Sequence, residues 1–447
     1  MKAIKKLSFD TSRLQYVAQD ILNEASRSGA DQAEVGIGTH KGFSISARRG
    51  DVETVEYHQD KTIEVRVFFG KRTGSASFSD LTSEAIHAAV EAACHIAKFT
   101  DEDPAAGLAD KNELAFHYPQ LDSAYPWIIS VEDAIKLACQ CEQEALAYDN
   151  HIMSTEDVRV NTTEAFGLHA NSYGFMGCFP YTRHEISCVL IAKKGDEMQR
   201  DYSYTTACDA KQLESVTAIA KQAAEKVIRR LGAKRIPTMK TPVIYIAEEA
   251  RGLLGHFAAA IQGGSLYRKA SFLLDHRDKK IFPDFMHIQE QPHLPRALGS
   301  APFDDDGVAT HANIFVENGV LCNYALGVYS ARKLAMQTTG NAGGTHNLTI
   351  RLGNKNLKTL LKTMDKGLLI TEMMGHGVNL LTGDYSRGVA GFWIEHGEIQ
   401  YPVHEITVAG KLQNMYKQIV EVGNDVDIRG NIRTGSILLE ELMVAGE

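Results

Sequence analysis

The chain has 447 residues and a formal net charge of −9 at pH 7, and 44% of its residues are hydrophobic and 23% charged, as in globular proteins of two or three domains. An acidic chain without a long basic run excludes nucleic-acid binding through clustered Lys and Arg. No stretch approaches the roughly 18 apolar residues of a membrane-spanning helix, and charges interrupt the basic N-terminus too often for a signal peptide.

The first half of the chain alternates between helical and strand patterns. Residues 11–28 and 83–99 each place apolar side chains on one helix face. Between them lie alternating stretches broken by glycine turns, which are typical of antiparallel strands. The same order of helix, strands and helix recurs between residues 131 and 232. The sequence therefore predicts an N-terminal α+β domain, residues 1–232, and suggests a duplicated helix–antiparallel sheet–helix unit; only the element order supports the duplication.

The second half has a different pattern. Residues 233–242, AKRIPTMKTP, carry two prolines and predict a linker. Beyond them glycine is dense and the apolar runs are short, with one helical pattern at 246–261 and another near 356–367. We therefore predict a β-rich C-terminal domain, residues 243–447, and an α+β protein overall.

Several short motifs do not identify a site. Gly36, Gly38 and Gly42 form GxGxxxG, one residue away from the dinucleotide fingerprint and without a βαβ unit around it; a tight turn between strands is the favoured interpretation. Tyr329 and Lys333 have the YxxxK spacing of some dehydrogenases, but no nucleotide-binding half accompanies them. The seven cysteines are scattered, which indicates reduced thiols and a cytoplasmic protein.

Polar residues gather in the glycine-rich C-terminal stretches. Glycine lets a backbone approach a ligand closely, so these residues are candidates for the lining of a cleft. The alternative is that the glycines form β-turns and bulges, with an internal Asp384–Arg387 ion pair. The candidates are His346, His376, Asp384, Tyr385 and Arg387.

Long segments of the chain resemble one known family. The most specific are GGSLYRKASFLLD (263–275), SAPFDDDGV (300–308), TTGNAGGTHN (338–347), LTGDYSRGVAGFWIEHGEIQYPVHEITVAG (381–410) and VGNDV (422–426), with MQRDYSYT (198–205) in the first half. These segments resemble the TldD/PmbA metallopeptidase family over nearly the whole chain. The resemblance implies a heterodimer in which a TldD-type subunit carries zinc on an HExxxH motif and a distant cysteine, while the other subunit lacks the metal.

The zinc motif of the family has no complete counterpart in this chain. By the resemblance, residues 247–252, AEEARG, occupy the HExxxH positions. Glu248 keeps the catalytic acid, but Ala247 and Gly252 replace both histidines, and Thr434 replaces the cysteine. We therefore expect no metal and no catalytic residue in this chain, and a structural or chamber-lining role for His256.

The resemblance implies the non-metal subunit of a cytoplasmic peptidase. Its expected partners are a TldD-type subunit, which holds the zinc, and an extended or unfolded peptide; alone, the chain is a candidate homodimer. Family members are linked to leader removal from a peptide antibiotic, to antitoxin degradation and, by an older label, to modulation of DNA gyrase. Two alternatives stay open: a regulatory binding protein without catalysis, and an independent hydrolase using His346 or His376 with Asp384 and a serine.

Overall fold

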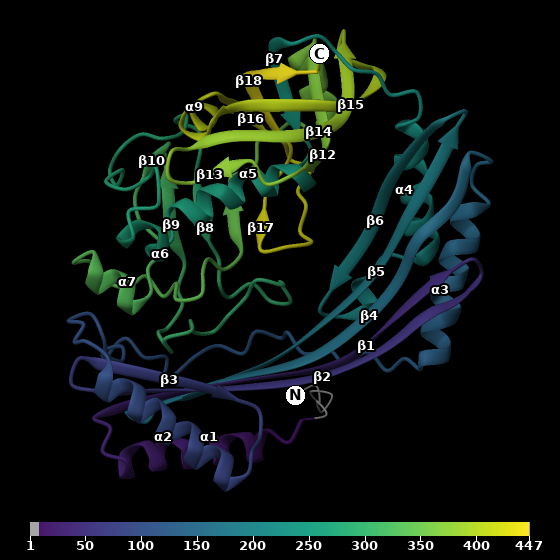
Figure 1. Ribbon diagram of the computed structural model, residues 1–447. Helices are drawn as coiled ribbons and strands as arrows, with labels where there is room; N and C mark the ends of the chain where they lie inside the picture. Colours follow the sequence, from purple (N-terminus) through teal and green to yellow (C-terminus); the bar gives the residue numbers. More distant parts are fainter. Residues whose placement is uncertain (1–8, 447) are drawn as a thin grey trace.

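A long six-stranded antiparallel sheet dominates the N-terminal half of the computed structural model, which describes residues 9–446 (Figure 1). The pairing of β1 with β4 joins two three-stranded meanders, so the strand order is β3-β2-β1-β4-β5-β6. The sheet curves around the C-terminal half of the chain (Figure 1). The strands are β1 (Gln32–Arg48), β2 (Asp51–Phe69), β3 (Arg72–Phe78), β4 (Ile152–Asn171), β5 (Met176–Lys194) and β6 (Glu197–Ala207).

Two pairs of amphipathic helices cover the outer face of this sheet. α1 (Thr11–Arg27) and α2 (Ser83–Phe99) pack on one end, and α3 (Val131–Leu146) and α4 (Val216–Arg229) pack on the other. The order helix, three strands, helix is therefore present twice, as predicted. Each helix begins after a Ser, Thr or Asp whose side chain accepts a backbone N–H of the first turn. Within residues 9–446, no helix is long and apolar enough to cross a membrane.

The C-terminal half contains two further sheets. One has five strands in the order β10-β9-β8-β11-β17. In the other, β12, β7, β18, β15 and β14 form a closed barrel because β12 also pairs with β14. The strands are β7 (Met239–Tyr245), β8 (Ile288–Glu290), β9 (Asn313–Glu317), β10 (Val320–Leu321), β11 (Leu348–Ile350), β12 (Gly367–Met374), β13 (Val378–Asn379), β14 (Asp384–Glu395), β15 (Glu398–Lys411), β16 (Ile419–Val422), β17 (Ile432–Arg433) and β18 (Ile437–Ala445).

α5 (Ala247–Ala260) joins these two sheets. It follows β7 and contacts β12 of the barrel and β17 of the other sheet, and it buries Leu253, Leu254 and Phe257 in the shared core. The helices predicted at 246–261 and near 356–367 are confirmed as α5 and α8 (Leu357–Met364). The shorter α6 (Gly263–Tyr267), α7 (Val328–Lys333) and α9 (Leu412–Lys417) have no counterpart in the prediction. The α+β class is confirmed.

The predicted linker is partly regular structure. β7 begins at Met239, so residues 239–242 already belong to the barrel. Lys234 forms a β-bridge with Val403 of β15. Division of the chain at residues 233–242 stays a prediction.

α7 connects the two halves near one end of the curved sheet. Tyr329 Oη donates to Asp103 Oδ2 at 2.7 Å, and Lys333 Nζ lies 2.8 Å from Asp103 Oδ1. These two hydrogen bonds lower the pKa of Asp103 to about 2. Arg332 donates to the carbonyls of Gly107 and Leu108 at 2.9 and 2.7 Å. The YxxxK spacing thus belongs to a contact between the two halves of the chain.

Candidate functional site

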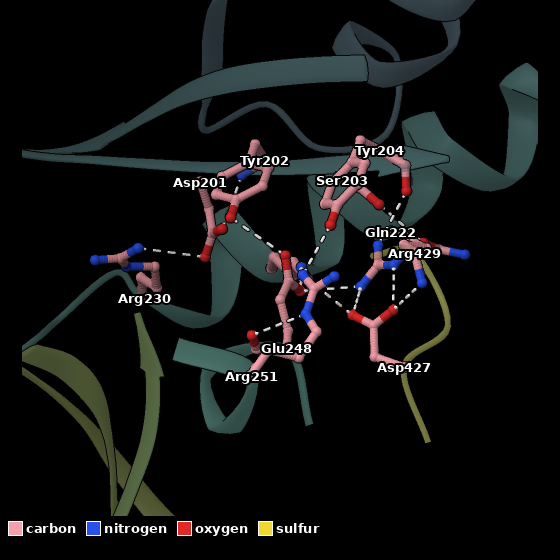
Figure 2. Close-up of polar contacts among 11 residues, drawn as sticks. Asp201, Tyr202, Ser203, Tyr204, Gln222, Arg230, Glu248, Arg251, Asp427 and Arg429 are labelled. Atoms are coloured by element: carbon pink, nitrogen blue, oxygen red, sulfur yellow. Dashed lines mark hydrogen bonds and ion pairs between the residues drawn. The ribbon is translucent and has the colours of Figure 1, made fainter. Parts of the chain in front are cut away.

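The N-terminus of α5 lies at a second junction between the two halves. β7 leads directly into this helix, and Glu248 and Glu249 occupy its first turn, where the helix dipole favours carboxylates. The side chain of Glu248 is 10% exposed and faces β6 (Figure 2). A carboxylate buried to this degree needs compensating charges or hydrogen bonds.

Three side chains compensate Glu248. Tyr202 of β6 donates from Oη to Glu248 Oε1 at 3.2 Å. Lys226 of α4 and Arg429, which follows β16, contact Oε2 at 3.2 and 3.3 Å. Since Lys226 comes from the N-terminal half and Arg429 from the C-terminal half, this one carboxylate links both halves of the chain (Figure 2).

Asp427 extends the same network. Its Oδ2 lies 2.8 Å from Arg429 Nη2 and 3.4 Å from Arg251 Nη2. Burial opposes the charged form of Asp427, but hydrogen bonds from Arg429 outweigh burial and lower the pKa of this carboxyl. The Arg429 guanidinium also lies over the Tyr204 ring, 4.3 Å from its centroid. We call the following residues the Glu248 cluster: Tyr202, Tyr204, Lys226, Glu248, Arg251, Asp427 and Arg429.

The residues at the zinc-motif positions do not fit a zinc ion. Ala247 and Gly252 lack side-chain donors, and the Thr434 hydroxyl donates to the Gly435 carbonyl at 3.0 Å. A Cβ at Gly252 would lie 2.8 Å from Met373 Cε. Across residues 9–446, no three His, Cys, Asp or Glu side chains are grouped as a metal site requires. Lys and Arg side chains balance the carboxylates here.

Three of the predicted chamber residues, His256, Tyr385 and Arg387, lie near one another and near Glu249. The rings of His256 and Tyr385 meet edge to face, with centroids 6.0 Å apart. Burial, together with the charge of Arg387, lowers the pKa of His256, so its imidazole is neutral at pH 7. Tyr385 is only 2% exposed and donates to Met373 Sδ at 3.1 Å. Burial, then repulsion from Glu248 next to it, raises the pKa of Glu249 to about 7.

Residues 384–387 begin β14, with a turn glycine before them at Gly383 and an irregularity of the strand pairing after them at residues 389–391. Asp384 pairs with Lys411 at 3.1 Å, and Arg387 Nε donates to the Met374 carbonyl at 3.0 Å. The internal Asp384–Arg387 ion pair is therefore wrong, because the two side chains have other partners.

His376 and Asp384 line an open cavity of about 510 Å³ together with Ser386. A serine hydrolase needs an acid that orients the histidine and a histidine bonded to the serine. Asp384 instead pairs with Lys411 and accepts the Thr382 hydroxyl at 2.5 Å. Among the hydrogen bonds of residues 9–446, none joins His376 to Asp384 or Ser386. This cavity therefore lacks the bonded arrangement of the hydrolase alternative.

His346 lies in a different cavity, between the N-terminal sheet and the C-terminal half. Burial lowers its pKa to about 4, and its Nε2 has no hydrogen-bond partner among the described residues. The structure thus groups the predicted residues around His256, around His376 and around His346, and Tyr385 belongs to the first two groups.

Sequence reasoning did not single out the cations and tyrosines of the Glu248 cluster. The alternation in DYSYT places Tyr202 and Tyr204 on one face of β6, which was the available signal. Lys226 and Arg429 carry no such signal, because they are two hundred residues apart in the chain and only the fold brings them together.

Family models match most of the chain. The PmbA/TldA metallopeptidase C-terminal domain matches residues 238–446, the central domain residues 124–231 and domain 1 residues 33–97. The chain belongs to the TldD/PmbA family of metallopeptidases. "Metalloprotease PmbA" of Escherichia coli O157:H7 is 44% identical over 447 residues, which are 100% of this chain and 99% of that protein. The family is one of proteases, and therefore of hydrolases.

Solved structures share the complete fold. A crystal structure from Bacteroides thetaiotaomicron, named as a candidate modulator of DNA gyrase, superposes with a TM-score of 0.92 at 27% identity and covers 99% of this chain and 100% of its own. TldE from Thermococcus kodakarensis superposes with a TM-score of 0.80 at 19% identity, covering 96% of this chain and 100% of its own. At that identity the second likeness concerns the fold alone.

Proposed function

We propose that this chain is the non-metal-binding subunit of a cytoplasmic TldD/PmbA-type metallopeptidase. The observation that carries the proposal is the pairing of Glu248 with Lys226 and Arg429. A catalytic acid of a zinc peptidase activates a metal-bound water. Here that carboxylate is bound by two cations and Tyr202, and the neighbouring positions hold no metal ligand. The TldD-type partner supplies the zinc ion, and this chain supplies part of the wall around the substrate.

The proposed substrate is an extended or unfolded peptide, as in leader removal from a peptide antibiotic or antitoxin degradation. Strands β3 and β6 form the two edges of the N-terminal sheet, and a peptide strand can add to such an edge through backbone hydrogen bonds. That mode of binding accepts varied sequences and rejects folded chains. It therefore suits a peptidase of unfolded segments.

The test is a comparison of the chain alone, a TldD-type partner alone and their mixture. Zinc content after dialysis and cleavage of an unfolded reporter peptide are measured for each. We expect zinc only where the partner is present, and the fastest cleavage in the mixture. Equimolar zinc on the isolated chain, or chelator-sensitive cleavage by it, would contradict the proposal.

One alternative has support from a relative. The Bacteroides structure carries a DNA gyrase modulator name, so a regulatory protein without catalysis is the second candidate. Adding this chain to a gyrase supercoiling assay, with and without the partner, separates the two. A change in supercoiling without any effect on the partner's peptidase activity would favour the regulatory role.

A further inference from the structure

A cavity of about 570 Å³ lies between the N-terminal sheet and the C-terminal half. Its floor is the inner face of β1, β2 and β4. Its ceiling is the turn at residues 304–306 and the segment at 342–346 of the C-terminal half. We call it the Gly36 cavity, after the glycine at the centre of its floor. It is distinct from the Glu248 cluster, with which it shares no residue.

Two glycines open the floor of this cavity. Gly36 lies between Glu64 of β2 and His169 of β4 in the strand register, so those two side chains flank a position without a side chain. A Cβ built at Gly36 or at Gly38 meets no atom within 4 Å. The expected turn at these glycines is wrong, because both lie inside β1. Their missing side chains leave room for a ligand against the sheet.

The walls carry a strong excess of acid. The only guanidinium among the lining residues is that of Arg66, which contacts Glu34 at 2.7 Å and Glu64 at 3.2 Å. Burial lowers the pKa of His169 to about 4, as it does for His346, so both imidazoles are neutral at pH 7. The lining carboxylates are Glu34, Glu64, Asp304, Asp305 and Asp306.

These carboxylates are not all committed to the fold. Asp304 accepts three backbone N–H groups and serves the turn itself. None of the hydrogen bonds found in residues 9–446 uses the carboxylate of Asp305. Burial, then repulsion from Asp306 and Glu64, raises the pKa of Asp305. The floor and the ceiling therefore present acidic groups that repel each other, and Arg66 forms ion pairs with only two of them, Glu34 and Glu64.

His169 gives an independent sign of a missing partner. The residue is 9% exposed, and its Nε2 has no hydrogen-bond partner among the described residues. That atom lies 3.9 Å from Glu34 Oε2, too far for a hydrogen bond. Buried polar atoms are nearly always paired, and a neutral imidazole nitrogen without a proton accepts a hydrogen bond from a ligand donor.

We propose that the Gly36 cavity binds an alkylammonium group, presented by the amino terminus or a lysine side chain of a peptide. An ammonium group has three N–H donors and one positive charge. These match the acidic groups of the floor and of the ceiling, and His169 Nε2 as an acceptor beside them. That the molecule bearing this ammonium group is a peptide rests on the proposed function. Recognition of the ammonium group itself does not depend on that function.

Binding is measured by calorimetry on the isolated full-length chain. The probes are acetyl-Ala-Lys-Ala-amide, Ala-norleucine-Ala-amide with a free amino terminus, and the acetylated norleucine peptide without any ammonium group. n-Butylamine tests the group without a peptide. We expect binding of the amine and of at least one charged peptide, and the stronger charged peptide identifies the source. Equal binding of the uncharged peptide would overturn the proposal.

Two variants and a matched control locate the site. Glu64→Gln should weaken binding about tenfold or more, the value of a lost hydrogen bond to a charged group. Glu56→Gln makes the same change on the same face of β2, about 26 Å away along the strand, and should leave the affinity unchanged. Gly36→Leu places a side chain on the floor, where a Cβ meets no atom within 4 Å, and should abolish binding at an unchanged melting temperature.

The outcomes separate this proposal from the proposed function. Calorimetry requires neither the partner nor turnover, so an inactive mixture leaves the ammonium test intact. No binding of n-butylamine or of either charged peptide sinks the ammonium site but leaves the subunit proposal standing. Equal losses in Glu64→Gln and Glu56→Gln would also overturn it, because the effect would then come from overall charge.

Discussion

Two clusters of charged side chains lie between the halves of this chain, and their charges are balanced differently. In the Glu248 cluster two carboxylates face Arg251 and Arg429 (Figure 2), and Lys226 lies 3.2 Å from Glu248. Around Gly36 five carboxylates face the single guanidinium of Arg66. In the first cluster the cations match the carboxylates, whereas in the second the carboxyl groups of the lining outnumber its one guanidinium.

This difference distinguishes a charged cluster that stabilises the fold from one that binds a ligand. Buried carboxylates at a junction are stabilised when Lys and Arg side chains neutralise them, and the ion pairs then hold one part of the chain against another. Carboxylates that stay buried without a cation cost stability, and such a cost is usual at sites that act on a ligand. The predictions below test whether the Glu248 cluster is structural and the Gly36 cavity is unbalanced.

The largest effect is expected for Arg429→Met. Arg429 contacts Glu248 and Asp427, whose side chains are 10% and 6% exposed, so its removal leaves two buried carboxylates with less compensation. Loss of one partner from a buried ion pair costs about 4 kcal/mol of unfolding free energy. Urea denaturation measures this loss. Lys136→Met breaks an exposed pair with Asp133 and should cost far less, because water already screens that pair; equal costs would contradict a structural role for the cluster.

The next effect concerns pH and Glu34. Burial, partly offset by Arg66, raises the pKa of Glu34 to about 7, so the folded chain favours the protonated form. The contribution of this protonation to the free energy of unfolding is complete below pH 4.5 and is lost as the pH rises through 7. It amounts to about 3 kcal/mol. Glu34→Gln should therefore reduce the fall in unfolding free energy between pH 5 and pH 8 by about that amount.

The control for this prediction is Glu56→Gln on the exposed part of β2. It should reproduce the pH dependence of the unchanged chain. His169, whose lowered pKa acts in the opposite sense below pH 6.5, is present in both variants and cancels in the comparison. An unchanged pH profile in Glu34→Gln would mean that the acidic cavity stores no such energy.

The sequence predicted the parts of these clusters that depend on local pattern. The helix containing Glu248 follows from its apolar periodicity, and the loss of the metal ligands follows from Ala247, Gly252 and Thr434 by resemblance. The short α6, α7 and α9 were missed, because five or six residues are too few to show a helical period.

Long-range contacts could not be predicted in this way. Gly36 and Glu64 face His169 only because β1 pairs with both β2 and β4, and the acidic ceiling comes from residues 304–306. The glycines therefore resembled a turn in the sequence and proved to be the floor of a cavity. The alternative that paired Asp384 with Arg387 relied on their proximity in the chain, whereas strand pairing supplied Lys411 and Met374 as partners.

A smaller effect on stability is expected for Arg387→Ala, a residue that belongs neither to the Glu248 cluster nor to the Gly36 cavity. Within residues 9–446 its guanidinium has one hydrogen bond, to the Met374 carbonyl, so truncation should cost about 1 kcal/mol of stability. If Arg387 lines the proposed chamber, turnover by the mixture with the partner should fall at least tenfold, the value of a lost charged hydrogen bond. The control is Lys411→Ala, which removes a neighbouring cation, the partner of Asp384, and leaves Arg387 in place. Normal turnover in Arg387→Ala would limit this residue to a structural role.

The smallest effect is expected when the missing histidines are restored. Ala247→His and Gly252→His together should bind no stoichiometric zinc and give no peptidase activity to the isolated chain. At Gly252 the new side chain must displace Met373 Cε, which lies 2.8 Å from the Cβ position. Lys226 and Arg429 already hold Glu248 and would repel a dication, and Thr434 offers no thiolate. Elemental analysis measures the zinc content of the double variant. A triple variant that also carries Thr434→Cys is the stronger test, because it restores all three ligand types. Tight zinc in the double variant would show that the Glu248 cluster gives way to a metal, and the contrast between a completed and an unbalanced cluster would then fail.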